Sequence, residues 1–271
     1  MGRGRSERVI VTKVAGLGSE RSVGRGPDRL IVEEPMSIQL DGTLVATTMR
    51  TPGHDFELAV GFCLTEGMLG DAPVVGVRYC ADGSALASEF NTVTVETGGR
   101  APEPTPRLGN VSSSCGWCGS EQLDELVARL TPLPPSDPFD LDVLQSVPET
   151  VRGGQDLFAA TGAVHGAAAF GRDGRIILLR EDVGRHNAVD KVVGALLLER
   201  GQDSPGSDLG LFVSGRASVE MVQKAWAGGF AALVAVSAPT ALAVDAARRA
   251  NLLLAGFVRG DAMNIYSPER L

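Results

Sequence analysis

The sequence predicts a mixed α/β protein, with a smaller β-rich part at the N-terminus and a larger α/β layer in the C-terminal half. Up to residue 97, runs rich in β-branched residues dominate and one helix-like stretch interrupts them. From residue 164 onward, short apolar runs alternate with amphipathic runs, which is typical of helices packed on a sheet. We therefore expect two subdomains, residues 1–109 and residues 110–271.

In the N-terminal part, the Asp41-Gly42 dipeptide separates two β-rich runs and predicts a hairpin turn. Asp55 opens a stretch whose apolar residues, Cys63 among them, recur at helical spacing. The polar, proline-rich run from Gly98 to Arg107 indicates a linker. The expected strands are Val9–Val14, Leu30–Leu40, Thr43–Met49, Val74–Cys80 and Asn91–Thr97.

In the C-terminal half, Asp173-Gly174 predicts a second hairpin turn, and Asn187 is expected to cap a helix. Gly228-Gly229 predicts a helix end. The expected strands are Val164–Phe170, Arg175–Arg180, Leu209–Val213, Leu233–Val236 and Leu252–Val258. Further helices are expected over Val219–Ala227 and Ala241–Asn251.

The charge balance argues against some partners. Lys and Arg number 25 against 33 Asp and Glu, so the net charge is −8, which disfavours nucleic-acid binding. The charge-free run Ala225–Val244 contains glycine and proline and is not uniformly apolar, so we expect no membrane span. No secretory signal precedes the first strand, and we expect a cytoplasmic protein without a disulfide framework.

The sequence SSSCGWCGS, Ser112–Ser120, presents Cys115 and Cys118 among small residues and predicts an exposed loop. A helix is expected directly after it, over Glu121–Leu130, with Ser120 as its N-cap. A helix N-terminus favours the thiolate form of a nearby cysteine, although the acidic first turn opposes this effect. Covalent sulfur transfer, thiol redox chemistry, zinc binding and chance surface thiols all remain possible interpretations of this pair.

Zinc binding is the weaker interpretation, because one CxxC supplies two of the four ligands that a structural zinc site needs. A zinc deaminase needs H-x-E upstream of P-C-x-x-C, whereas His165 lies downstream of the pair and no proline precedes Cys115. We therefore expect no metal site. A thioredoxin-like motif follows a strand, and here a proline-rich linker precedes the pair, so redox chemistry ranks below sulfur transfer.

Several longer motifs accompany the cysteine pair and make the chain resemble the FdhD family of formate dehydrogenase accessory sulfurtransferases. The resemblance begins at the E-E-P-M-S-I segment, Glu33–Ile38, and runs over nearly all of the remaining chain. The motifs are SSSCGWCG, VHGAAAF (Val164–Phe170), REDVGRHNAVDKVVGAL (Arg180–Leu196), SGRAS (Ser214–Ser218) and GFVRGDAMNIYS (Gly256–Ser267).

This resemblance implies a cytidine deaminase-like α/β layer without its zinc motif. It also implies an activity: such proteins accept sulfane sulfur from a cysteine desulfurase, carry it as a persulfide and pass it to a molybdenum cofactor bound as bis(molybdopterin guanine dinucleotide). The sulfurated cofactor then enters formate dehydrogenase. The partners implied are the desulfurase, formate dehydrogenase and a second copy in a homodimer.

The resemblance assigns roles to residues of this chain. Cys115 becomes the persulfide carrier and Cys118 its assistant. The cofactor-binding segment falls on Phe257, Val258, Arg259, Gly260, Asp261 and Ala262. His165 and Arg216 are further pocket candidates, followed by Asp182, Arg185 and His186, whereas Cys63 and Cys80 are expected to be structural. A cofactor chaperone without sulfur chemistry and a thiol redox protein remain the alternatives.

Overall fold

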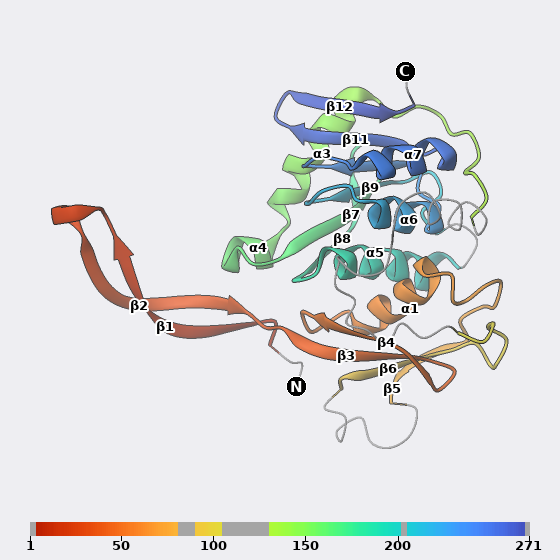
Figure 1. The fold of residues 1–271 in the computed structure, drawn as a ribbon, viewed down its shortest axis with the longest axis horizontal. Helices are drawn as coiled ribbons and strands as arrows, with labels where there is room; N and C mark the ends of the chain where they lie inside the picture. Colours follow the sequence, from red (N-terminus) through yellow and green to blue (C-terminus); the bar gives the residue numbers. More distant parts are fainter. Residues whose placement is uncertain (1–3, 81–89, 105–129, 202–204, 269–271) are drawn as a thin grey trace.

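The structure is a computed structural model that describes residues 4–80, 90–104, 130–201 and 205–268. It confirms a mixed α/β protein. Figure 1 shows a body built around a four-stranded sheet and a six-stranded sheet, from which a long hairpin projects. The predicted subdomain boundary after residue 109 falls in the segment 105–129, outside the described residues, and stays a prediction.

The projecting hairpin consists of β1 (Ser6–Ala15) and β2 (Ser22–Ile31), which pair in antiparallel register and turn through a short 3-10 helix, η1 (Gly18–Glu20). We call residues 6–31 the arm. The sequence predicted one strand over Leu30–Leu40, which was wrong. β2 ends at Ile31 and a separate strand starts at Glu34, because the chain leaves the arm and enters the body at this point.

The small sheet has the strand order β4-β3-β6-β5, with α1 (Asp55–Thr65) packed on it. Its hairpin turn at Asp41-Gly42 is confirmed: both residues have positive φ, 47° and 88°, as a tight hairpin turn requires. The strands are β3 (Glu34–Leu40), β4 (Thr43–Arg50), β5 (Gly76–Tyr79) and β6 (Thr92–Glu96).

The large sheet has the strand order β12-β11-β10-β9-β7-β8, in which β9, β10 and β11 are parallel. Both faces of the sheet centre are covered, so the central strands β9 and β10 are apolar and buried throughout. The strands are β7 (His165–Phe170), β8 (Ile176–Asp182), β9 (Gly210–Val213), β10 (Ala232–Ala235), β11 (Leu253–Arg259) and β12 (Ala262–Ser267).

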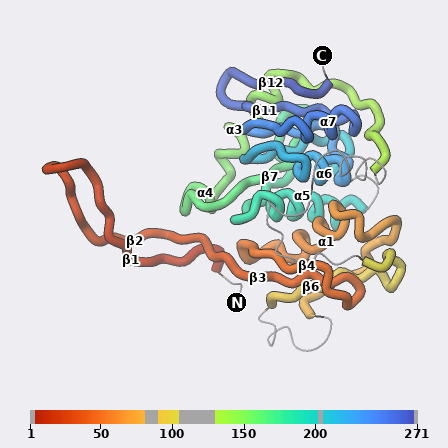
Figure 2. The backbone as a smooth tube through the Cα atoms, viewed as in Figure 1, coloured from red at the N-terminus to blue at the C-terminus, as the bar shows by residue number. Residues whose placement is uncertain are grey.

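Helices α5 (Arg185–Arg200), α6 (Val219–Ala227) and α7 (Ala241–Ala250) cover one face of this sheet. Helix α3 (Leu141–Gly153) covers the other face and leads into α4 (Asp156–Thr161), as Figure 2 shows along the backbone. The sequence analysis missed most of β2 and all of α3, α4 and β12. The predicted helix end at Gly228-Gly229 is confirmed, whereas the predicted cap at Asn187 was wrong, because α5 begins at Arg185 with Gly184 as N-cap.

The two sheets are joined where α1 crosses α5 so closely that the two helix backbones are in contact. A Cβ added at Gly61 would lie 1.9 Å from the Asp190 carbonyl oxygen, and one added at Gly194 would lie 1.9 Å from the Glu57 carbonyl oxygen. Two glycines facing each other thus allow the helices to touch. Leu197 of α5 completes the core of the small sheet.

Replacing Gly194 by alanine should therefore destabilise the protein by about 3 kcal/mol or more, because backbone has to move to admit one methyl group. The midpoint of urea unfolding measures the loss. Gly153→Ala is the matched control, since that helical glycine has no atom within 4 Å of an added Cβ. Equal midpoints for Gly194→Ala and the wild type would contradict the close helix crossing.

Candidate functional site

A cavity of about 800 Å³ opens at the edge of the large sheet where the parallel strands end. Ser214 follows β9, Val236 follows β10 and Val258 lies near the end of β11. The antiparallel strand β7 begins at the same edge with His165. Ligands of α/β proteins bind outside the carboxyl ends of parallel strands, so the topology favours a binding site here.

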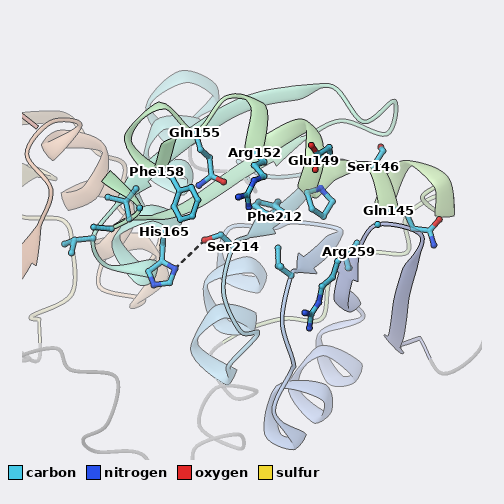
Figure 3. Close-up of a pocket in the computed structure, with 18 of the residues that line it drawn as sticks. Gln145, Ser146, Glu149, Arg152, Gln155, Phe158, His165, Phe212, Ser214 and Arg259 are labelled. Atoms are coloured by element: carbon cyan, nitrogen blue, oxygen red, sulfur yellow. Dashed lines mark hydrogen bonds between the residues drawn. The ribbon is translucent and has the colours of Figure 1, made fainter. Parts of the chain in front are cut away.

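Helices α3 and α4 and the loop that follows them form the opposite wall of the cavity. Figure 3 shows their side chains facing the strand ends, with Arg259 across from α3. The labelled residues on this wall are Gln145, Ser146, Glu149, Arg152, Gln155 and Phe158. The wall combines both charges with amide and aromatic groups, which suits a ligand with phosphate and ring components.

His165 lies at the floor of the cavity beside Ser214. Its Nδ1 is 3.4 Å from Ser214 Oγ, which also accepts a hydrogen bond from the Gly166 amide at 3.0 Å. Burial, and next the Arg185 guanidinium, lower the pKa of His165, against the smaller opposing effect of Asp182. His165 is therefore neutral near pH 7 and presents an uncharged imidazole to the cavity.

Gln155 supplies an unused donor. Its side chain is 7% exposed, and Nε2 has no hydrogen-bond partner within the described parts of the chain. Gly166 makes room for it, since a Cβ at that position would lie 2.5 Å from Nε2. A buried amide without a partner costs free energy that a ligand oxygen would recover. Together with Arg152 and Arg259, it fits an anionic ligand.

The residues of α4 that line the cavity are held by Glu181. Its two carboxylate oxygens accept hydrogen bonds from the Leu157 and Phe158 amides, at 2.9 and 2.8 Å. A carboxylate is stabilising at a helix N-terminus because the free amides there are donors. Glu181 thereby fixes one wall of the cavity to the end of β8.

Asp182 is the centre of a buried network between the two sheets. One oxygen accepts from the Gly184 amide and Asn187 Nδ2, and the other accepts from the Thr51 amide and from Lys191 Nζ at 2.6 Å. Lys191 Nζ also donates to the Thr51 carbonyl at 2.9 Å. Both charged side chains are 0% exposed. Asp182 is thus fully occupied by structural contacts.

A second buried network lies where α1, α5 and α6 meet. Lys224 Nζ is 2.9 Å from both oxygens of Asp190 and 3.1 Å from Glu66. Burial disfavours its charge, but Asp190 and Glu66 outweigh burial and raise the pKa of Lys224. His186 lies near this network, and burial together with Lys224 and Arg185 lowers its pKa to about 4.

The structure brings some of the predicted cofactor residues together and leaves others apart. His165, Val258, Arg259 and Gly260 line the cavity. Arg216 is exposed and stands outside the residues that line it. The three remaining predicted residues flank the lining: Phe257, over whose ring Arg259 lies at 5.7 Å, Asp261 in the turn to β12, and Ala262 at the start of β12. Their roles in binding stay predictions.

Of the cysteines, Cys115 and Cys118 lie outside the described residues. Cys63 and Cys80 are buried, as a structural role requires, and burial raises the pKa of the Cys63 thiol. Within the described ranges no group of three or more His, Cys, Asp or Glu side chains is arranged to hold a metal ion. In those ranges we also find no helix with the length and apolarity of a membrane span.

The sequence analysis missed the cavity wall formed by α3 and α4. Pro148 inside α3 and the glycines at 153 and 154 weaken the helix signal of this segment. One available signal was the apolar spacing of Leu144, Val147 and Val151, which places all three in the core.

Comparison with known proteins agrees with the motifs and the fold. The model of the FdhD/NarQ family matches residues 31–271. The chain belongs to the FdhD/NarQ family. The family model therefore covers the body and begins at Ile31, the last residue of the arm.

Among the relatives, the sulfur carrier protein FdhD of Nocardia farcinica is 47% identical over 90% of this chain and 88% of its own length. The sulfur carrier protein FdhD of Streptomyces avermitilis is 43% identical over 99% of this chain and 96% of its own length. A crystal structure from Desulfotalea psychrophila, assigned as a formate dehydrogenase accessory protein, has a TM-score of 0.75 at 22% identity and covers 97% of this chain and 99% of its own. This last similarity concerns the fold.

The contact between α1 and β8 gives a pH-dependent prediction. Burial works against the Glu57 charge, but hydrogen bonds from Arg180 and His54 lower the pKa of Glu57 to about 2 from its usual 4.5. A lowered pKa stabilises the fold above pH 4.5, and that stabilisation is lost as the pH falls toward 2. Because the pair is partly exposed, we expect about 2 kcal/mol at pH 7.

The free energy of unfolding of Glu57→Gln should therefore approach that of the wild type as the pH falls, with more than half of the difference gone between pH ~5 and pH ~3. Urea unfolding at each pH measures it. Glu199→Gln, at an exposed position of α5, is the control. A difference that does not change with pH would show that the Glu57 charge is not what stabilises the fold.

Proposed function

We propose that this chain is a sulfur carrier and sulfurtransferase of formate dehydrogenase maturation. It accepts persulfide sulfur from a cysteine desulfurase on Cys115 and transfers it to the molybdenum cofactor, bound as bis(molybdopterin guanine dinucleotide), before the cofactor enters formate dehydrogenase. The reaction takes place in the cytoplasm, where thiols stay reduced. The partners are the desulfurase, formate dehydrogenase and a second copy of the chain.

The observation that carries this proposal is the cavity at the carboxyl edge of the large sheet, in a chain whose relatives are named sulfur carrier protein FdhD. Arg259, Arg152 and the free amide of Gln155 fit the phosphates of a guanine dinucleotide. Gly260 has φ +56° and no atom within 4 Å of an added Cβ, so backbone there is open to a ligand.

The sulfur chemistry must balance in electrons. The outer sulfur of a persulfide is at the oxidation level of elemental sulfur, and a sulfido ligand needs two electrons more. We assign those electrons to Cys118, whose thiolate attacks the Cys115 sulfur and forms a disulfide while the outer sulfur leaves as sulfide. Sulfide then replaces an oxygen ligand of the substrate cofactor, and that oxygen leaves as water with two protons, one from the Cys118 thiol and one from the persulfide.

Loading of Cys115 is tested by mass spectrometry after incubation with a cysteine desulfurase and cysteine. The peptide with Cys115 should gain one sulfur atom, and Cys115→Ala should abolish both this gain and formate dehydrogenase activity in a strain that depends on the chain. Cys63→Ser, at a buried thiol far from the pair in sequence, is the control. Full activity with Cys115→Ala would instead favour a cofactor chaperone.

Ligand binding is tested with guanosine diphosphate, which represents half of the dinucleotide. Arg259→Ala should weaken its binding by about 10-fold or more, because a charged hydrogen bond to phosphate is lost. Arg200→Ala is the matched control, since that arginine is exposed at the end of α5 and is not among the residues that line the cavity. Isothermal titration calorimetry measures both. Absence of any nucleotide affinity in the wild type would support the thiol redox alternative.

A further inference from the structure

The arm presents two different faces. In its antiparallel register, residues directly opposite each other share a face. One face carries the pairs Arg8–Arg29, Ile10–Pro27, Thr12–Arg25 and Val14–Val23. We call it the basic face: it has three arginines and no acid. The opposite face carries Glu7, Asp28 and Lys13 and is mixed in charge.

In an isolated molecule the basic face destabilises the arm. Arg8 and Arg29 stand directly opposite each other, and like charges in that position destabilise a strand pair. Ile10, Val14 and Val23 are 59%, 59% and 67% exposed. A two-stranded hairpin is marginally stable on its own in water. These features are explained if an anionic surface with apolar patches covers this face.

The body of the chain provides an anionic surface. Residues 1–31 contain 7 Lys and Arg against 3 Asp and Glu, a net charge of +4, whereas residues 32–271 contain 18 against 30, a net charge of −12. The segment 137–156, which contains α3 and the start of α4, has one base, Arg152. Its exposed acids are Asp137, Asp140, Asp142, Glu149 and Asp156. We call it the acidic surface.

The arm and the acidic surface stand on the same side of the molecule. β2 contacts α4, and Arg5 donates to the Glu181 carbonyl at 3.3 Å, so the arm leaves the body beside α4. From there it points away from its own α3 (Figure 1). A strand of 10 residues is about 33 Å long, against about 20 Å for the 13 residues of α3, so one arm is long enough to run along both helices.

We propose that two copies of this chain exchange their arms, so that the basic face of each arm lies along the acidic surface of the other copy. A two-fold axis beside α4 makes both contacts identical, as a closed dimer requires. Because Asp142 and Glu149 also line the cavity, the arm of the second copy then borders the cavity mouth. The proposal rests on the homodimer named above and adds the surfaces that form it.

The test compares two full-length triple variants by sedimentation velocity at several concentrations and salt levels. In the first, Arg8, Arg25 and Arg29 of the basic face become glutamate; in the second, Asp142, Glu149 and Asp156 of the acidic surface become lysine. Each triple variant alone should raise the dimer dissociation constant at least 100-fold relative to the wild type.

When the two triple variants are mixed, they should form a heterodimer, because both contacts are then again between opposite charges. Lys13→Glu, on the other face of the arm, is the control and should dimerise like the wild type.

The outcomes separate the possible failures. A monomeric wild type would overturn both the homodimer and the exchange, whatever persulfide loading of Cys115 shows. If both triple variants still dimerise like the wild type, the arm exchange is wrong and the homodimer stands. Recovery of the dimer in the mixture cannot come from misfolded chains and supports the exchange directly. Binding of a duplex oligonucleotide by a monomeric wild type, lost in the first triple variant, would assign the basic face to nucleic acid and overturn the proposal.

Discussion

The buried ion pair between Asp182 and Lys191 is the interaction on which the rest of the structure depends. Four hydrogen bonds occupy the lone pairs of the carboxylate, and two of them come from Thr51 and Lys191, on opposite sides of the junction between the sheets. Removing either charge would leave the other buried without its opposite charge, which costs about 3–5 kcal/mol. Asp182 is also paired across the sheet with His165, so the same residue sets the edge at which the cavity opens.

The motif that identifies the family is therefore mainly architectural in this chain. Arg180 holds α1 through Glu57, Glu181 holds α4, and Asp190 holds α6 through Lys224. The Glu181 contact positions a wall of the cavity, and the other two hold α1 and α6 to the rest of the body. The proposed sulfur chemistry is assigned to a separate segment. A long charged motif can thus be specific to a family largely through contacts inside the protein, because a buried charge needs its partner at one place and neighbouring positions are constrained together.

Prediction from sequence succeeded where the signal is local. Hairpin turns such as Asp41-Gly42 and the alternation of apolar runs gave the mixed α/β class and most strands of both sheets. Prediction failed for residues whose contact partners are distant in the sequence. Asn187 resembles a helix cap, but its amide donates to the Met49 carbonyl and to Asp182. Likewise, a binding role for Arg259 and Gly260 was expected only through the family resemblance, whereas Gln155 becomes a candidate through its position against Gly166.

The central claim, that sulfur passes from this chain to a cofactor held in its cavity, is tested most directly by a single-turnover transfer. The chain is loaded with radioactive sulfur by a cysteine desulfurase, freed of excess reagents and mixed with the molybdenum cofactor, which is then separated from the protein. The account predicts that the label leaves Cys115 and is recovered with the cofactor, and that the Arg259→Ala chain, although equally loaded, transfers it much more slowly. Label that stays on the protein, or that transfers equally fast from both chains, would contradict it.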